Sequence, residues 1–568
     1  MLNGETTSIS IEQVRNYAWS VASMIRQEGN TEIRTVCAVY LAYICLTKDI
    51  DASSLEDYIG RELDENRQFF LKENFGDDYS VIKDVIEISS LEMIRAYMID
   101  YQSFAGRSSI MFMTPTSLVA LANRFLEIQA NSKVADFGCG IGNFVCKTAL
   151  EKKSECFGVD IHTHSVEIAR IRAEVLSLTS VEIEQNDMFA LNEEIKFDRI
   201  FSNYPFGMRL KGLQGGNEYL QRLYDRIPGV VRITSSDWVY NCLLIDHLSD
   251  DGKAVAIMSN GSTWNTVDER IRSHFVQSGL IEAVIELPTR LFEETSIGTS
   301  LVVFSRGNKE VRFIDARDIF VKGRRQNEFS DENIESIYGL MTQTDDRARS
   351  VGFDEIKSND YVLNPSRYLG KPIEVKNGVP FGDLIKKMTR GAQIKASDLD
   401  ELASDAPTDT QYLMLAHIQN GMIQENLPFL EPLDDKYSKY YIHDKNLLMS
   451  KNGMPYKVTI AEVKSNQKIL ANGNMFVIEL DEDKVNPYYI KAFFNTETGR
   501  SLLRSISVGS SIPNISATAL KSLVVPLPDK EEQDRLASAY CAKEDEIKVL
   551  EYKLNKAKSD LENIFEED

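Results

Sequence analysis

The chain has 568 residues, of which 43% are hydrophobic and 26% charged. This composition is typical of a soluble globular protein, and the length predicts three or four domains rather than one core. No run of about eighteen apolar residues occurs, so we expect no membrane-spanning segment. The net charge of −22 argues against a uniformly basic nucleic-acid-binding surface, although local basic clusters could still contact phosphate.

The seven cysteines are scattered and include no Cys-x-x-Cys pair. This pattern favours reduced thiols over a disulfide framework or a structural zinc site, and we expect no bound metal. The first residues, MLNGETTSISIEQ, lack the basic and then apolar order of a secretion signal. Together these features predict a cytoplasmic protein.

Amphipathic helical patterns separated by short acidic breaks fill the beginning of the chain. Residues 36–46 form an apolar run that predicts a buried helix, and another helical pattern follows Ser89 and Ser90. Residues 1–105 are therefore predicted to form an all-helical domain.

Short apolar strands alternate with helical patterns over residues 106–370. The first three of these strands end at Asp136, at Asp160 and just before Asn203, and later apolar runs occupy residues 254–258, 281–287 and 301–304. This alternation predicts a Rossmann-like domain built on a parallel α/β sheet. Because ligands bind at the carboxyl ends of such strands, we expect the three polar residues to border a binding site.

The pattern changes twice more along the chain. Residues 371–528 combine short β-like runs with many turns, which predicts a separate α+β domain. Residues 529–568 form one long charged helix whose apolar positions repeat at heptad spacing. These positions are Ile547, Leu550, Leu554, Ala557, Leu561 and Ile564. Such a helix either packs on its own domain or pairs with a second helix, for example in a homodimer.

A glycine-rich motif, VADFGCGIG, occupies residues 134–142. Gly138, Gly140 and Gly142 would let the backbone turn sharply from strand to helix and approach a ligand closely. Dinucleotide sites use similar glycines, but their pyrophosphate loop is spaced GxGxxG, whereas this loop is spaced GxGxG.

Acidic residues beside the glycines suit S-adenosylmethionine better than NAD. Asp136 could meet a cationic amino group, and Asp160, with Ile161 beside it, could accept hydrogen bonds from ribose hydroxyls. Asp187 could accept a hydrogen bond from the adenine amino group while Met188 contacts the ring. On its own, Asp187 is better explained as a helix cap.

Thr114 and Pro115 precede the glycine loop. Thr114 is predicted to cap a helix that begins at Pro115. A Thr-Pro pair in this position also resembles a cofactor-contacting segment of one class of DNA adenine methyltransferases. We therefore include both residues in the predicted cofactor site.

The stretch FSNYPFG (residues 201–207) resembles the Asn-Pro-Pro-aromatic motif of enzymes that methylate exocyclic amino groups. In that motif the Asn side chain and the next backbone carbonyl accept the two amine hydrogens, which directs the nitrogen lone pair at the methyl group. The aromatic residue stacks on an extruded base. We predict that Asn203, Tyr204, Pro205 and Phe206 form the catalytic motif. Tyr204 replaces the first proline but keeps its carbonyl, and we expect its larger side chain near the pocket.

The order of motifs over residues 1–370 resembles the modification subunit of type I restriction–modification systems, an N6-adenine DNA methyltransferase of the γ class. The stretches that carry this resemblance are SDW (236–238), GKAVAIMSNG (252–261), LPTRLFEETSIG (287–298), FIDA (313–316) and NDYVLNPSRY (359–368). Tyr204 and Pro365 depart from the family's usual residues. The resemblance implies a sequence-specific DNA adenine methyltransferase that uses S-adenosylmethionine and rotates its target base out of the helix.

Residues 371–528 are similar to one target-recognition domain of the specificity subunit in the same systems, with the clearest match at VVPLPDKEEQ (524–533). The resemblance implies double-stranded DNA as a partner, and a separate restriction or specificity subunit is a further expected partner. We see no Walker A sequence and no nuclease motif, so restriction would need another chain. Two other functions remain open, namely an inactive DNA-recognition scaffold and a protein-glutamine or RNA methyltransferase.

Overall fold

A computed structural model describes residues 9–25, 31–99, 113–206, 208, 216–227, 236–292, 295, 297–323, 326–369, 375, 377–394, 396–424, 426–464, 467–507 and 513–562. The chain divides into two compact units, Met1–Leu369 and Gly370–Asp568. We describe each unit by itself. In the part of the chain that is described, no helix is both long enough and apolar enough to cross a bilayer.

The beginning of unit 1 is helical, as predicted. We call residues 11–99 the helical segment. Its α-helices are α1 (Ile11–Met24), α2 (Thr31–Lys48), α3 (Leu55–Glu62), α4 (Glu65–Asn74), α5 (Ile82–Glu87) and α6 (Leu91–Ile99). Helix α2 contains the predicted apolar run and is buried along most of its length, which makes it the central helix of this segment.

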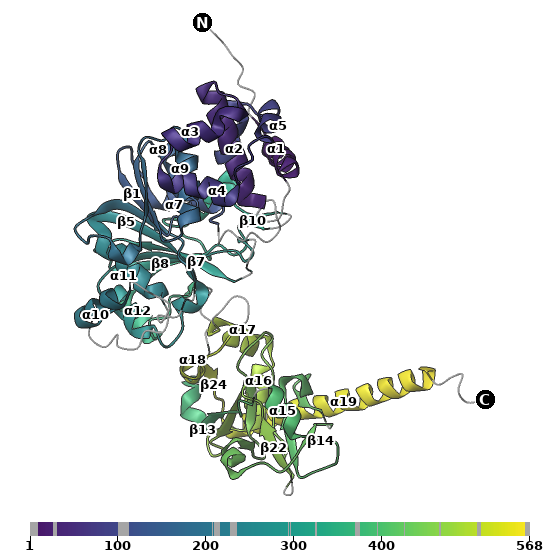
Figure 1. Ribbon diagram of the computed structural model, residues 1–568. Helices are drawn as coiled ribbons and strands as arrows, with labels where there is room; N and C mark the ends of the chain where they lie inside the picture. Colours follow the sequence, from purple (N-terminus) through teal and green to yellow (C-terminus); the bar gives the residue numbers. More distant parts are fainter. Residues whose placement is uncertain are drawn as a thin grey trace. The chain divides into compact units, whose positions relative to one another are not determined.

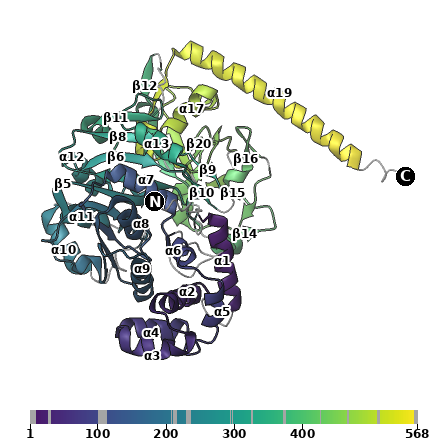
Figure 2. The ribbon, with the colours of Figure 1, turned by 90° about the horizontal axis from the view of Figure 1, so that it is seen from above.

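The helical segment lies beside α8 (Asn143–Lys152) and α9 (Thr163–Val175), as Figures 1 and 2 both show. Ile168, Ile171 and Val175 of α9 are buried in the same hydrophobic cluster as α2 and α6. Buried ion pairs reinforce this packing, because Arg67 of α4 contacts Glu167 of α9 at 2.8 Å. The helical segment and the α/β part of unit 1 therefore share one core.

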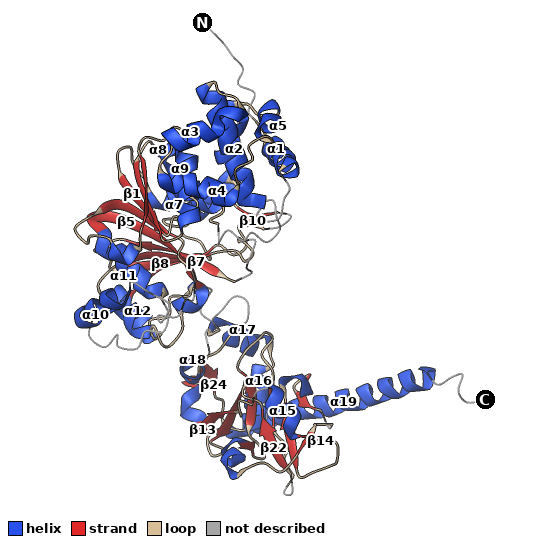
Figure 3. Cartoon of the chain, viewed as in Figure 1, coloured by secondary structure: helices blue, strands red, loops and turns tan. Residues whose placement is uncertain are grey.

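A nine-stranded sheet follows, with strand order β11-β8-β6-β7-β5-β4-β1-β2-β3. The strands are β1 (Lys133–Phe137), β2 (Glu155–Asp160), β3 (Val181–Gln185), β4 (Phe197–Ser202), β5 (Leu248–Ser259), β6 (Ile281–Glu286), β7 (Thr299–Phe304), β8 (Glu310–Asp315) and β11 (Ala348–Gly352). Figure 3 shows this sheet in red between blue helices.

The prediction of a parallel sheet is correct for β3-β2-β1-β4-β5 and for the pair β6-β8, and wrong for β7 and β11. Strand β7 runs antiparallel between β5 and β6, and β11 runs antiparallel to β8. Parallel neighbours need a crossover connection, usually a helix. The chain instead passes from β6 to β7 through residues 287–298 and returns beside β6 in the opposite direction.

Helices cover both faces of this sheet (Figure 1). Helices α7 (Thr116–Leu126), α8, α9 and α13 (Asp331–Gly339) pack on one face. Helices α10 (Gly216–Arg226), α11 (Asp237–His247), α12 (Glu269–Gln277) and α14 (Phe353–Ser358) pack on the other. Buried on both faces, strand β7 has no exposed residue, as expected for a sheet between two helical layers.

Unit 2 mixes strands and helices, as predicted for an α+β domain. One sheet contains β13 (Ile385–Arg390), β23 (Met475–Leu480), β20 (Leu447–Ser450) and β21 (Val458–Ile460). A second contains β14 (Ala403–Ser404), β18 (Phe429–Leu430), β15 (Thr410–Leu413), β22 (Lys468–Ala471) and β19 (Tyr441–Ile442). Its helices are α15 (Ala396–Leu402), α16 (Pro487–Phe494), α17 (Glu497–Ser505), α18 (Ala517–Ser522) and α19 (Lys530–Glu562), and β12 (Gly378–Pro380) pairs with β24 (Val524–Pro526).

The predicted long helix corresponds to α19. Its first half packs on unit 2, where Glu544 forms a 2.6 Å ion pair with Lys491 of α16. Beyond that point the heptad positions are open to solvent, with Leu550 57% and Leu561 73% exposed, whereas Ile564 lies outside the described residues. The first half of α19 therefore packs on its own domain, whereas the second half leaves its heptad face open for pairing with another helix.

Candidate active site

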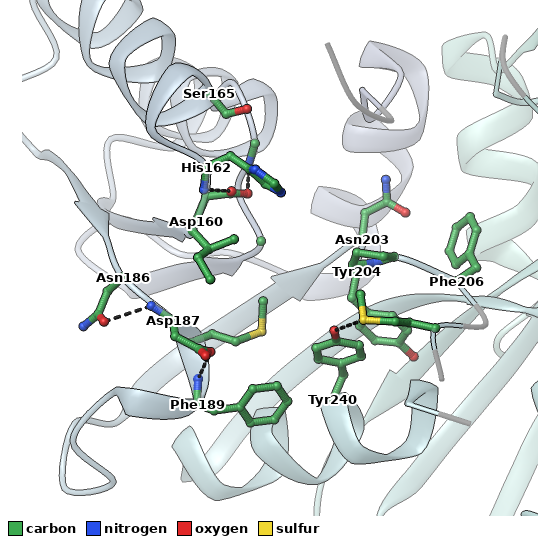
Figure 4. Close-up of a pocket in the computed structure, with 16 residues that line it drawn as sticks. Asp160, His162, Ser165, Asn186, Asp187, Phe189, Asn203, Tyr204, Phe206 and Tyr240 are labelled. Carbon is green, nitrogen blue, oxygen red and sulfur yellow. Dashed lines mark hydrogen bonds between the residues drawn. The ribbon is translucent and has the colours of Figure 1, made fainter. Parts of the chain in front are cut away.

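A cavity of about 440 Å³ lies at the carboxyl ends of β1, β2 and β4 (Figure 4). Its lining residues come from the glycine loop, from the ends of β2 and β3, and from the segment after β4. They are Gly138, Gly140, Asp160, Ile161, His162, Ser165, Asn186, Asp187, Met188, Phe189, Asn203, Tyr204, Pro205, Phe206, Met208 and Tyr240. Thr114, Pro115, Asp136 and Gly142, which were also predicted for the site, are not among them.

The glycine loop turns into α8 through left-handed backbone conformations. The φ angle is +81° at Gly138 and +77° at Gly142, a region that only glycine adopts readily. A side chain at Gly142 would also approach the Cβ of Ala169 to 3.0 Å. Gly142 therefore fixes how α8 packs on α9, while Gly138 and Gly140 face the cavity.

Asp160 is the last residue of β2 and ties the glycine loop to the next turn. Its Oδ2 accepts a hydrogen bond from the Gly140 amide at 2.9 Å, and its Oδ1 accepts one from the His162 amide at 2.9 Å. Each carboxylate oxygen keeps a further lone pair. Beside it, Ile161 lines the cavity with 53% of its surface exposed.

Asp187 caps a short 3₁₀ helix, η2 (Met188–Ala190), and also lines the cavity. Its Oδ1 accepts a hydrogen bond from the Phe189 amide at 3.0 Å, so the helix-cap interpretation is correct for this oxygen. Because Asp187 and Met188 both border the cavity as well, capping and ligand contact do not exclude each other here.

Asp136 lies within β1, behind the glycine loop, and its side chain is almost completely buried. Its Oδ1 has no hydrogen-bond partner among the described residues. Burial, and to a smaller extent the charge of Asp160, raises the pKa of the Asp136 carboxyl well above its usual range. An unpaired buried carboxylate is costly unless a cation compensates it. Asp136 is therefore suited to a positively charged ligand group.

Asn203 directly follows β4, and the two ends of its amide have different surroundings. Its Nδ2 donates a hydrogen bond to Oγ1 of Thr114 at 3.0 Å. Its Oδ1 is buried and has no hydrogen-bond partner within the described ranges. Since Asn203 lines the cavity, this oxygen is an unused acceptor at the place where a ligand would lie.

The structure contradicts the prediction that Thr114 caps a helix beginning at Pro115. Helix α7 begins at Thr116, and Pro115 is its cap residue with an extended ψ of 142° and no side-chain hydrogen bond. The Thr114 hydroxyl is used instead by Asn203, and the Thr114 carbonyl accepts a 2.9 Å hydrogen bond from Nδ2 of Asn143. Thr114 therefore joins the glycine loop to the segment after β4.

The side chain of Tyr204 is accommodated in the hydrophobic core. It is 1% exposed, and its ring stacks on that of Tyr240 at a centroid distance of 4.7 Å and an interplanar angle of 19°. Its hydroxyl donates a 2.9 Å hydrogen bond to Oδ1 of Asn241. Figure 4 shows Tyr204 beside Tyr240 and next to Asn203. The replacement of proline by tyrosine thus adds core packing, and the larger side chain lies at the cavity, as expected, because Tyr204 is one of its lining residues.

The remaining residues of the motif border the cavity. Pro205 is exposed, and Phe206 is half-buried with its ring edge-on to Phe292 at a centroid distance of 5.8 Å. Gly207 lies outside the described residues. An aromatic ring at the mouth of a cavity provides a flat face for a planar ligand.

Apart from Asn186 and Phe189, which flank the predicted Asp187 and Met188, sequence reasoning missed four lining residues: His162, Ser165, Met208 and Tyr240. His162 and Ser165 could have been found, because they follow the end of β2, at the cap and in the first turn of α9. Met208 and Tyr240 carry no comparable signal, since only tertiary folding brings them to the cavity. Within the described ranges, no group of three or more His, Cys, Asp or Glu side chains is gathered as a metal site would require.

Comparisons with known proteins agree with this arrangement. Residues 92–376 match the N-6 DNA Methylase family, and residues 405–555 match the type I restriction modification DNA specificity domain. The chain is 27% identical over 310 residues to the type I restriction enzyme HindI methylase subunit of Haemophilus influenzae, and 27% identical over 345 residues to the MjaIX methylase subunit of Methanocaldococcus jannaschii. These matches span 50% and 55% of this chain, and 69% and 60% of the respective relatives.

Among solved structures, the chain resembles the type I restriction-modification system methyltransferase subunit from Streptococcus thermophilus. The TM-score is 0.51 at 18% identity, over 63% of this chain and 99% of that one. This similarity concerns the fold. The family match covers half of the chain, so the protein belongs to the N-6 DNA methylase family and joins to its methylase region a type I restriction–modification DNA specificity domain.

Proposed function

We propose that this protein transfers a methyl group from S-adenosylmethionine to N6 of an adenine that is rotated out of a specific DNA site, within a restriction–modification or related defence system. The observation that carries the proposal is the unpaired, buried Oδ1 of Asn203 in the cavity. Methylation of an aromatic amine needs acceptors for its hydrogens, because accepting them frees the nitrogen lone pair from the ring.

S-adenosylmethionine is the cofactor of this family and supplies an electrophilic methyl group. The residues present fit it. Asp136, buried behind the glycine loop and outside the cavity lining, would pair its free carboxylate oxygen with the amino group of the cofactor. Asp160 would accept hydrogen bonds from the ribose hydroxyls, and Asp187 and Met188 would border the adenine. Gly138 and Gly140 allow the close approach.

The chain's own groups would then position the target amine. Oδ1 of Asn203 would accept a hydrogen bond from one hydrogen of the adenine amino group, and the backbone carbonyl of Tyr204 would accept one from the other. Phe206 would stack on the base. No strong general base is required, because the nitrogen loses its proton after the transfer. Most of the rate enhancement would come from positioning and aligned dipoles.

Unit 2 supports DNA as the substrate. Two basic clusters that are distant in sequence meet around a surface hollow of about 440 Å³, where Arg390 lies with Lys436 and Lys439. Tyr437 and Tyr440 line the same hollow. Basic and aromatic side chains together suit contacts with a phosphate backbone. We propose that this unit reads one half-site of the recognised sequence, and that a restriction subunit, if present, is a separate chain.

Turnover on DNA tests the proposal directly. The purified protein is incubated with radiolabelled S-adenosylmethionine and unmethylated genomic DNA, and modified bases are mapped by long-read sequencing. Label in adenine within one recurring motif is expected. Label in RNA or protein would favour the other methyltransferase classes. Folded protein that binds cofactor but modifies nothing would favour the inactive scaffold, which is weakened by the accommodation of Tyr204 in the core.

Cofactor affinity is expected to weaken as the pH falls. The pKa of Asp136 is raised in the free protein by burial and by Asp160, and a cationic amino group beside it would stabilise the ionised form. Binding should therefore release a proton and lose affinity below the raised pKa. Calorimetry in buffers of different ionisation enthalpy measures both effects. Asp136→Asn should bind more weakly and without the pH dependence, whereas proton-independent binding by the native protein would contradict this role.

We also propose that two chains pair through the exposed half of α19, so that two recognition units read a split site. Light scattering coupled to size exclusion should then give twice the mass of one chain. Leu550→Glu with Leu554→Glu places charges on the heptad face and should yield monomer, whereas Tyr552→Glu, off that face, should remain dimeric. A native protein that is monomeric both with and without DNA would refute the pairing.

A further inference from the structure

Hydrogen bonds join four residues from α9 to the cavity, and they pass through both the main-chain carbonyl and the hydroxyl of Thr114. At one end, Nη1 of Arg172 donates to Oδ1 of Asn143 at 2.5 Å. Nδ2 of Asn143 then donates to the carbonyl of Thr114 at 2.9 Å, and the Thr114 hydroxyl accepts from Nδ2 of Asn203 at 3.0 Å. We call these residues the relay.

The far end of the relay is anchored in the helical segment. Arg172 is 1% exposed, and its Nε donates to the carbonyl of Met98, near the end of α6, at 2.9 Å. Its Nη1 also donates to the carbonyl of Ile141 in the glycine loop at 2.7 Å. Burying a guanidinium is costly unless its donors are satisfied, so these carbonyls are held firmly around it.

The first part of the relay, from Arg172 to the Thr114 carbonyl, has a fixed direction because a guanidinium can only donate. Asn143 must therefore turn its oxygen to Arg172 and its amide nitrogen to Thr114. If the Asn143 amide were rotated by 180°, its NH₂ group would face the guanidinium of Arg172, which is also a donor. Its oxygen would then face the carbonyl oxygen of Thr114, which is also an acceptor. The Thr114 hydroxyl can donate as well as accept, so the fixed direction ends at the Thr114 carbonyl. The Asn143 bond holds the Thr114 backbone in place. The hydroxyl of the same residue accepts from Nδ2 of Asn203, whose Oδ1 stays unpaired at the cavity.

We infer that Arg172 and Asn143 are positioning residues for methyl transfer, and that the helical segment acts through them to hold Thr114, and with it the amide of Asn203, in place at the cavity. This inference rests on the proposed function, because it assigns the relay to the same acceptor oxygen. Neither residue lines the cavity. Their effect on the rate would come from geometry, where small displacements of a reacting group can cost about 100-fold.

The sharpest variant is Asn143→Asp. It keeps an acceptor for Arg172, and with a stronger charge-assisted bond, but replaces the donor to Thr114 with an oxygen that repels its carbonyl. In the full chain we expect the thermal midpoint to be retained and the cofactor dissociation constant to stay within about threefold, while kcat falls at least tenfold. An unchanged kcat overturns the inference.

Arg67→Met provides the matched control. Arg67 is also a buried arginine between the helical segment and α9. Its ion pairs go to Glu167 and Glu174, neither of which belongs to the relay. This variant should lower the thermal midpoint and leave kcat unchanged at temperatures where it is folded. An equal loss of kcat in Arg67→Met and Asn143→Asp would mean that general loosening is responsible, and would overturn the inference.

Hydrogen exchange separates failure of this inference from failure of the proposed function. In Asn143→Asp, peptides covering residues 113–126 and 197–206 should exchange faster than in the native protein, whereas Arg67→Met should affect residues 65–74 instead. If the native protein shows no turnover, the proposed function fails, and the exchange pattern alone decides the relay. Unchanged exchange at 113–126 and 197–206 would overturn it.

Discussion

Replacing Asn203 by alanine is expected to lower kcat for methyl transfer by about 10²–10³-fold, the loss typical of removing one preorganised polar group from an active site. The unpaired Oδ1 of Asn203 is the acceptor proposed for the target amine, and alanine has none. Cofactor binding should change little, because the proposed cofactor contacts lie on other residues. Initial rates with labelled S-adenosylmethionine at saturating DNA, together with calorimetric cofactor binding, measure the two quantities.

The control for this variant is Asn192→Ala. Asn192 is exposed and caps a turn through the amide of Glu194 at 3.0 Å, so the same substitution there should leave kcat unchanged. A kcat that Asn203→Ala leaves intact would remove the central support of the proposed function. A parallel loss of cofactor affinity would place Asn203 in the cofactor site instead.

Restoring the family's usual proline, Tyr204→Pro, is expected to destabilise unit 1 by about 3 kcal/mol, because it removes a large buried side chain and leaves a cavity. The ring stacks on Tyr240, and its hydroxyl bonds to buried Asn241. The variant should therefore melt a few degrees lower, and its kcat should not exceed that of the native protein.

Tyr204→Phe isolates the hydroxyl in the same position. It should cost about 1 kcal/mol, the usual net value of one hydrogen bond, because the ring is kept. Thermal unfolding of the three proteins side by side gives the comparison. A proline variant as stable as the native protein would show that the tyrosine ring contributes nothing to the core, and a faster one would show that Tyr204 limits the rate.

Local sequence patterns were sufficient to predict the strands of the cofactor-binding half of the sheet in unit 1 and the turn between β1 and α8. Asp160 and Asn203 could be placed at strand ends because apolar runs stop there, and the glycines at 138–142 could be placed in a tight turn because their spacing requires it. The direction of β7 could not be predicted, since an apolar run has no polarity of its own. It follows from the connection over residues 287–298, whose described residues form no crossover helix, and β7 pairs antiparallel with β6.

A site residue could be predicted from the sequence where a local motif marks it, but not where its role depends on a partner that is distant in the sequence. Thr114 was misassigned as a cap because its use depends on Asn203, which lies 89 residues away. The position of the Tyr204 ring depends on Tyr240 and Asn241 of α11, and neither is marked by a motif. Arg172 and Asn143 could not be predicted as site residues for the same reason. Their proposed role depends on hydrogen bonds between segments that only the fold brings together.

The shared core of the helical segment and α9 has a consequence for dissecting this protein. Ile168, Ile171 and Val175 are fully buried only because α2 and α6 cover them. A truncated protein that began near residue 113 would present these side chains to water as one contiguous apolar patch, and such patches promote self-association. The catalytic half would then be recovered as aggregate, and its insolubility could be mistaken for a lack of activity. The smallest autonomous methylase fragment therefore includes the helical segment.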